Sequence, residues 1–132
     1  GYLPLINNPV LSEHFIQNQA TIHGDTNVIR QGHRTGSTDM GDVSHIMPAL
    51  HPSMAGAIGS NHAIDWAIDD PQMAFLEPAK ALAWMAVDLL TNNAQAGARL
   101  LNEFEPLMTK NQYLAYQRGI SKTDLWSGDQ LN

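Results

Sequence analysis

Histidine and aspartate side chains gather in the middle of the sequence, where four of the six histidines fall within thirty residues. These are His33, His45, His51 and His62, accompanied by Asp39, Asp42 and Asp65. Imidazole nitrogen and carboxylate oxygen are ligands that zinc, manganese or nickel accept. No two histidines have the spacing that places two ligands on one face of a helix or strand. The pattern therefore leaves open both a single-metal site built from the four histidines and a set of hydrogen-bonding loop residues.

Other chemistries are less well represented in the sequence. It contains no cysteine, so any metal must be held by His, Asp or Glu. Ser37 and Ser44 belong to a Gly-rich segment in which a serine can be exposed for nucleophilic attack. That segment is not the Gly-x-Ser-x-Gly turn of serine hydrolases, and no clear strand leads into it. A serine hydrolase is therefore disfavoured.

The charge balance argues against two classes of partner. Seven Lys and Arg stand against thirteen Asp and Glu, which gives a net charge of −6. Such a chain has no basic stripe for nucleic acid and is repelled by an anionic membrane surface. No stretch approaches the roughly 18 apolar residues that span a bilayer. We therefore expect a soluble, cytoplasmic protein that has neither nucleic acid nor membrane as a partner.

Three helices are predicted from capping signals and apolar periodicity. Asn8-Pro9 should begin the first, which ends near His23-Gly24. Asp70-Pro71 should begin the second helix, which continues to Leu90. Pro78 should either kink this helix or mark its true start. The third runs from Ala94 to about Met108, and residues 110–132 form a further helix and coil that packs back. The sequence thus predicts three or four amphipathic helices.

Strand signals are fewer and lie between the first two helices. Residues 25–44 are rich in Gly, Thr, Asp and His and indicate a loop. Residues 46–50 and 54–58 resemble short strands at a sheet edge, because Pro48 and Pro52 lack an amide donor. Two such strands cannot cover several amphipathic helices. Either other residues complete the sheet or the fold is nearly all helical; we favour the first, a partial three-layer α/β fold.

The order of four features resembles a known enzyme family. Gly36, Ser37, Thr38 and Asp39 continue as Met-Gly-Asp-Val-Ser, and a Met-Pro-Ala strand, a Gly-Ser-Asn-His62 turn and a Pro-Ala-Lys-Ala-Leu-Ala helix follow. Across roughly residues 1–90 this order resembles the amidohydrolases that include aminoacylase, p-aminobenzoyl-glutamate hydrolase and the glutamate carboxypeptidases. Such ordered agreement is more specific than any one of the motifs.

The resemblance implies an organisation and a set of roles. Family members have a zinc-peptidase α/β domain with a lid domain inserted in its sequence, so residues 1–132 would form the C-terminal segment of that catalytic domain. A start at Gly1 instead of Met agrees with this expectation. By position His62 would ligate one of two metals, zinc or manganese. Gly36, Ser37, Thr38 and Asp39 would border the substrate, with His33 and His45 behind them as candidates for supporting contacts.

The family's remaining catalytic motifs are missing from these residues. The resemblance implies an upstream His-x-Asp ligand motif, a metal-bridging Asp and a Glu-Glu pair, and the sequence has none of them. We therefore expect no catalytic residue in this segment and no amidase activity from it alone. The parent protein would hydrolyse N-acyl or N-aminobenzoyl amino acids or small dipeptides as a homo-oligomer. The alternative is a non-catalytic module for oligomerisation or partner binding.

Overall fold

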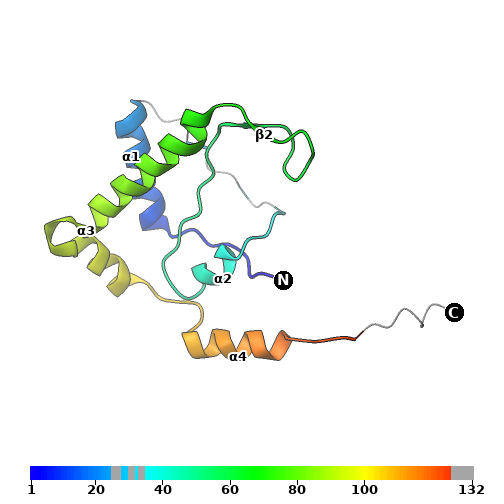
Figure 1. Ribbon diagram of the computed structural model, residues 1–132. Helices are drawn as coiled ribbons and strands as arrows, with labels where there is room; N and C mark the ends of the chain where they lie inside the picture. Colours follow the sequence, from blue (N-terminus) through cyan, green and yellow to red (C-terminus); the bar gives the residue numbers. More distant parts are fainter. Residues whose placement is uncertain (25–27, 30–31, 33–34, 126–132) are drawn as a thin grey trace.

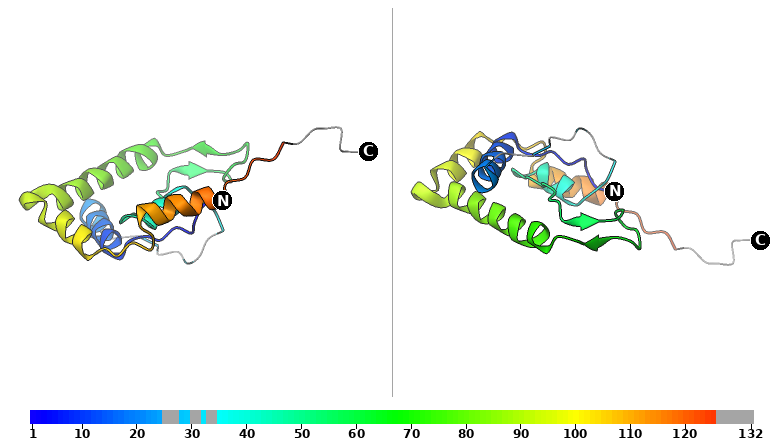
Figure 2. Two further views of the ribbon diagram at one scale, coloured as in Figure 1. Left: turned by 90° about the horizontal axis from the view of Figure 1, so that it is seen from below. Right: turned by 90° about the horizontal axis from the view of Figure 1, so that it is seen from above.

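The structure is a computed structural model that describes residues 1–24, 28–29, 32 and 35–125 (Figure 1). Its elements are α1 (Pro9–His23), α2 (Met40–Ser44), β1 (Ala57–Ile58), β2 (Ala67–Ile68), the π-helix η1 (Gln72–Leu76), α3 (Glu77–Glu103) and α4 (Lys110–Ile120). Figure 2 shows α1 beside α3, with the β1–β2 hairpin extending beyond the N-terminal end of α3. Helices form the framework, and the hairpin projects from it.

The predicted α/β fold is wrong, because helix dominates and the described residues contain a single two-stranded sheet. β1 and β2 pair antiparallel, with Ala57 opposite Ile68 and Ile58 opposite Ala67. The predicted strand over residues 46–50 does not form. Its backbone makes isolated contacts instead, such as the 2.7 Å hydrogen bond from Asn8 N to Ala49 O. Pro48 and Pro52 remove donors from this stretch, so no regular ladder develops.

The capping signals predict the start of α1 correctly. Asn8 Oδ1 accepts hydrogen bonds from the amides of Val10 and Leu11, at 3.0 and 3.1 Å. Pro9 occupies the first helical turn, where its missing amide costs nothing. Gly24 ends the helix with a φ of 80°, which glycine adopts without steric penalty. Local residue choice alone therefore fixes both ends of this helix.

The long element α3 consists of two helical halves. Pro78 lies at its first turn, which confirms the prediction that this residue marks a true start. Asn92, Asn93 and Ala94 have φ values of 51°, 57° and 57°, so residues 77–90 and 95–103 are separate helical stretches. The sequence predicted this break between Leu90 and Ala94. It wrongly extended the second half to Met108, whereas the helix ends at Glu103 ahead of Pro106.

A capping box begins α4, the helix predicted in the tail. Thr109 Oγ1 accepts from the amide of Gln112, and the Gln112 side chain accepts in turn from the amide of Thr109 at 2.8 Å. The backbone amide of Met108 also donates to His45 O at 3.1 Å, which joins this turn to the end of α2. Trp126, which the sequence placed in the same tail, lies outside the described residues. In the part of the chain described, no helix combines the length and apolar character that crossing a bilayer requires.

The core lies between α1 and both halves of α3. Leu11 and Phe15 of α1 pack against Ala81, Met85 and Leu100 of α3. Leu50, Met54 and Leu89 are partly buried around them. Because this cluster is small, each of its side chains should carry a large share of the hydrophobic stabilisation.

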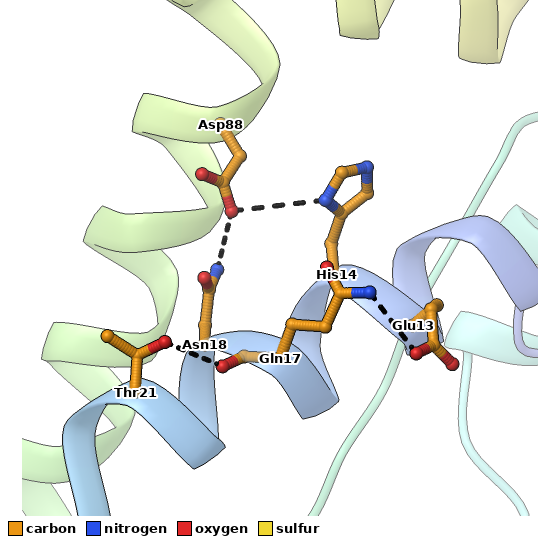
Figure 3. Close-up of polar contacts among 6 residues, drawn as sticks. All are labelled: Glu13, His14, Gln17, Asn18, Thr21 and Asp88. Carbon is orange, nitrogen blue, oxygen red and sulfur yellow. Dashed lines mark hydrogen bonds and ion pairs between the residues drawn. The ribbon is translucent and has the colours of Figure 1, made fainter.

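Polar residues complete the α1–α3 interface (Figure 3). Asn18 Nδ2 donates to Asp88 Oδ2 at 2.7 Å, and His14 Nδ1 lies 4.0 Å from the same oxygen. Nearer the start of α3, the buried Glu77 accepts from Lys80 Nζ at 2.8 Å, and its Oε2 lies 3.3 Å from His23 Nε2. The hydrogen bond from Lys80, aided by the charges of Lys80 and His23 and opposed by burial, lowers the pKa of Glu77.

Truncating the adjacent residues Leu100 and Leu101 should distinguish a core position from a surface position by the loss of unfolding free energy. Leu100 is 8% exposed and Leu101 is 65% exposed, although both lie on the second half of α3. Leu100→Ala should reduce the free energy of unfolding by about 2–4 kcal/mol through lost burial and a residual cavity. Leu101→Ala should change it by less than about 0.5 kcal/mol. Urea denaturation followed by circular dichroism measures both, and equal effects would contradict the core assigned here.

Glu77 should make stability depend on pH. Because its pKa in the folded chain lies below the ordinary value of 4.5, it stabilises the fold above about pH 4.5. This stabilisation is lost as the pH falls through the folded-state pKa. Glu77→Gln should therefore flatten the fall in unfolding free energy between about pH 6 and pH 3. Glu105→Gln, which changes an exposed carboxyl outside the helices, should leave that fall close to wild type.

Candidate functional site

The β1–β2 hairpin presents His62, the predicted metal ligand. Its loop is closed by backbone hydrogen bonds from Ala63 N to Ser60 O at 3.0 Å and from Trp66 N to Ala63 O at 3.2 Å. Gly59 has a φ of 80°, and a side chain there would overlap the carbonyl of Asp65. The turn that carries His62 thus depends on a glycine at position 59.

The hairpin is joined to the helical framework at Gly56. Gly56 O accepts hydrogen bonds from the amides of Asp69 and Asp70, at 3.0 and 3.1 Å. Asp70 Oδ1 accepts in turn from Met73 N at 3.0 Å, at the start of η1. A Cβ at Gly56 would lie 2.7 Å from Ala74 N, so a side chain has no room here. The position of His62 is therefore tied to the beginning of η1 and α3.

His62 itself has an unusual backbone and a free side chain. Its φ is 64°, in the left-handed region that non-glycine residues seldom adopt. The imidazole is exposed, and it makes no hydrogen bond or ion pair with any other described residue. A non-glycine residue held in this conformation costs about 1 kcal/mol or more, and such residues concentrate at functional sites. Both features suit an imidazole that binds a group outside this framework.

The predicted substrate segment lies in an exposed stretch leading into α2. Gly36, Ser37 and Asp39 are exposed, and Thr38 is half-buried. Thr38 Oγ1 lies 3.3 Å from Asp39 Oδ1 and accepts weakly from Met40 N at 3.4 Å. Asp39 takes the N-cap position of α2 without a capping hydrogen bond from its side chain. No hydrogen bond or ion pair within the described ranges joins this stretch to the His62 loop.

His45 and Ser44, which the sequence suggested as a supporting contact and a nucleophile, are buried and make hydrogen bonds within the fold. His45, a candidate supporting contact, is 7% exposed, and its Nδ1 is 2.9 Å from Gly41 O. Ser44 Oγ donates to Gly41 O at 2.6 Å and accepts from Ile6 N at 3.1 Å. Because Ser44 is 4% exposed and its proton is donated to a backbone carbonyl, it does not suit nucleophilic attack.

The four-histidine metal site is not assembled by this fold as far as it is described. His33 lies outside the described residues. His45 is buried against α2, whereas His51 and His62 are exposed. Across residues 1–24, 28–29, 32 and 35–125, no group of three His, Asp or Glu side chains is arranged to hold a metal ion. The predicted ligand His62 is therefore exposed at the hairpin tip, and it belongs to no such group of candidate ligands among the described residues.

Sequence reasoning missed the polar cluster around Asp42, which it named only as one of the aspartates near the four histidines. Asp42 Oδ1 accepts from Leu3 N at 2.8 Å, and Oδ2 accepts from Tyr113 Oη at 3.0 Å and Gln117 Nε2 at 3.2 Å. Burial, the hydrogen bond to Asp42 and its negative charge raise the pKa of Tyr113. These partners are 39 to 75 residues away in sequence, so no local pattern indicated them.

A pocket of about 280 Å³, lined by both polar and apolar side chains, adjoins the contacts drawn in Figure 3. Its wall includes His14 and Asp88, together with Asn92, Arg99 and Glu103 near the break in α3. The lining includes the cationic Arg99 and the anionic Asp88 and Glu103, and Asp88 is already hydrogen-bonded to Asn18. The mixed charge gives no clear preference for one ligand charge.

Comparison with known proteins gave no relative: no family model, no curated protein and no solved structure matches the chain.

The substitution Gly41→Ala, which adds one methyl group, tests the close approach of Gly41 to the N-terminal segment. A Cβ at Gly41 would overlap the Leu3 carbonyl oxygen and lie 2.9 Å from its carbon. Gly41→Ala should therefore lower the free energy of unfolding by about 1–3 kcal/mol. An exposed helical glycine would instead be stabilised by alanine by about 0.5–1 kcal/mol. Gly36→Ala, where a Cβ meets no atom within 4 Å, is the control and should have little effect. Stabilisation by Gly41→Ala would contradict this packing.

Proposed function

We propose that this chain supplies one metal-ligating histidine, His62, to the centre of a metal-dependent amidohydrolase. The supporting observation is the presentation of His62: an exposed imidazole that pairs with no other described residue, on a left-handed residue at the tip of an anchored hairpin. The left-handed conformation at position 62 costs free energy, and residues held in it concentrate at functional sites. The resemblance of residues 36–44 and of the Gly-Ser-Asn-His62 turn to the aminoacylase and carboxypeptidase family supports the same role.

One histidine does not make a metal centre. The described residues fit the group only in part, because a single exposed imidazole suits zinc or manganese whereas a full ligand set is not gathered here. The proposal therefore requires further nitrogen and oxygen ligands from other polypeptide. Two divalent ions, when bound, would polarise the scissile amide carbonyl and activate a water molecule. His62 would hold one of those ions in place, and residues 36–39 would contact the substrate.

The substrate class follows from the same resemblance. We propose N-acyl or N-aminobenzoyl amino acids or small dipeptides, each of which has one amide bond and a carboxylate. The exposed residues Gly36 and Ser37 offer their backbone amides and the Ser37 hydroxyl as neutral hydrogen-bond donors, which suit a carboxylate or a carbonyl oxygen. Asp39 would favour a protonated amine on the substrate over a second carboxylate.

The first experiment compares two exposed histidines in the native protein. Intact-mass spectrometry gives the length of the native polypeptide, and metal analysis gives its zinc and manganese per chain. His62→Ala should lose about one metal equivalent and reduce hydrolysis of an N-acetyl amino acid by at least about 100-fold, because altering even outer contacts of a metal site costs 10–100-fold. His51→Ala, which removes another exposed histidine, should retain both.

Three outcomes would count against the proposal. Equal metal content in His62→Ala and wild type would remove the ligand role. Equal losses in His62→Ala and His51→Ala would point to general misfolding instead of ligation. A native polypeptide of 132 residues without bound metal would exclude catalysis and favour an interaction module.

A further inference from the structure

The start of α1 and both halves of α3 enclose the pocket of about 280 Å³, which we call the α1–α3 pocket. Val10 and His14 line it from α1, and residues on both sides of the break line it from α3. The two halves of α3 lie close together, because a Cβ at Gly97 would be 3.0 Å from Leu89 O. The volume is just below the range of about 300–1,000 Å³ that is usual for drug-sized ligands. The pocket therefore has room for a small molecule.

The turn that shapes this pocket is held in a strained backbone conformation. Asn92, Asn93 and Ala94 have φ values of 51°, 57° and 57°, in the left-handed region. Asparagine adopts this region with little penalty, whereas the Cβ of alanine is crowded by the following carbonyl oxygen. Such strained residues concentrate at active sites and ligand clamps. Asn92 itself lines the pocket, so the strain lies in the pocket wall.

Three charged side chains of the pocket keep hydrogen-bonding capacity that the fold does not use. Arg99 and Glu103 lie one helical turn apart, a spacing at which opposite charges commonly pair. Neither makes an ion pair or a hydrogen bond with another described residue. Asp88 uses Oδ2 for its contacts with Asn18 and His14, and its Oδ1 has no partner in the described part of the chain (Figure 3). One guanidinium and two carboxylates are thus available to a ligand.

This combination of charges suits a ligand that is positive at one end and negative at the other. A simple anion would be attracted by Arg99 and repelled by Asp88 and Glu103, and a simple cation would meet the reverse. A carboxylate matches the fork of a guanidinium, and an ammonium donates up to three hydrogen bonds to carboxylates. Side chains one turn apart are separated by about 5–6 Å at Cβ, so the two groups of the ligand must be close together. An α-amino acid, which carries both on one carbon, meets this requirement.

The remaining wall of the pocket suits an apolar side chain. Val10 is exposed, Ala96 is half-buried and Leu100 is buried, and all three line the pocket. An aliphatic group of the ligand that covers them would remove apolar surface of both molecules from water. The same wall offers no charge to a second polar group on the ligand side chain. The matching amino acid is therefore aliphatic.

We propose that the α1–α3 pocket binds a free aliphatic α-amino acid, with its carboxylate on Arg99 and its ammonium between Asp88 and Glu103. An N-acylated amino acid lacks the ammonium and is a poor match for this pocket. The lining residues come from α1 and α3 alone, so the site is separate from the His62 loop and does not rest on the metal role of that histidine. Because the ligand contacts α1 and both halves of α3, its binding should also stabilise the folded chain.

Isothermal titration calorimetry of the native protein with L-leucine tests the ligand class. L-Leucine should bind saturably at one site per chain. N-acetyl-L-leucine, which has no ammonium, and L-leucinamide, which has no carboxylate, should each bind at least about tenfold more weakly. A hydrogen bond between charged groups accounts for a difference of that size. Glycine should also bind more weakly than L-leucine, because it has no side chain to cover the apolar wall.

Charge-neutralising variants assign each end of the ligand. Arg99→Gln should weaken L-leucine binding at least about tenfold and remove the preference for L-leucine over L-leucinamide. Glu103→Gln should instead reduce the preference for L-leucine over N-acetyl-L-leucine. Arg118→Gln and Glu105→Gln, which change exposed charges outside the pocket, are the matched controls and should bind L-leucine as wild type does. Arg99 and Glu103 make no contact that the fold requires, and circular dichroism checks that each variant stays folded.

The outcomes distinguish this proposal from the metal role of His62. His62→Ala should bind L-leucine with unchanged affinity, so a failure of the metal proposal leaves this test intact. Three results would overturn the amino-acid site: no saturable binding of L-leucine, equal affinity for L-leucine and its two neutralised derivatives, or equal affinity of Arg99→Gln and Arg118→Gln for L-leucine.

Discussion

The packing of α1 on α3 is the constraint on which the rest of the structure depends. Leu11 and Phe15 leave water against Ala81, Met85 and Leu100, and Leu50, Met54 and Leu89 pack around this cluster. The break at residues 91–94 turns the second half of α3 so that Leu100 reaches the same cluster as Met85. Buried Glu77 and half-buried Asp88 are kept in this interface by polar partners from α1 and α3, which offset their desolvation.

A second set of contacts joins α2 to the N-terminal segment and to α4. Asp42 accepts hydrogen bonds from the N-terminal segment and from α4, while Gly41 lets Leu3 approach the backbone of α2. A short helix of five residues is not stable alone, so its contacts in effect define its position. The carboxylate at residue 42 therefore has an architectural role, and the exposed residues just before it remain available for a ligand.

His62 lies on a hairpin fixed at Gly56 and at the start of η1, and the described part of the chain does not cover its side chain. The free energy cost at this position lies in the left-handed backbone, because water hydrates an exposed imidazole. The neighbouring helix α3 exposes Leu82 and Leu90, at 70% and 68%, and these apolar side chains gain nothing from contact with water.

The sequence by itself determined the local structure. Asn8-Pro9 and Gly24 set the limits of α1, Pro78 set the start of α3, and the gap between Leu90 and Ala94 set its break, because caps and proline act through neighbouring backbone atoms. It also singled out His62, by the motif around it. Tertiary structure decided the rest: the failure of a strand at residues 46–50, the burial of His45 and the role of Asp42. These depend on partners such as Tyr113, 71 residues away from Asp42, and pairing across such distances is set by packing that no local pattern encodes.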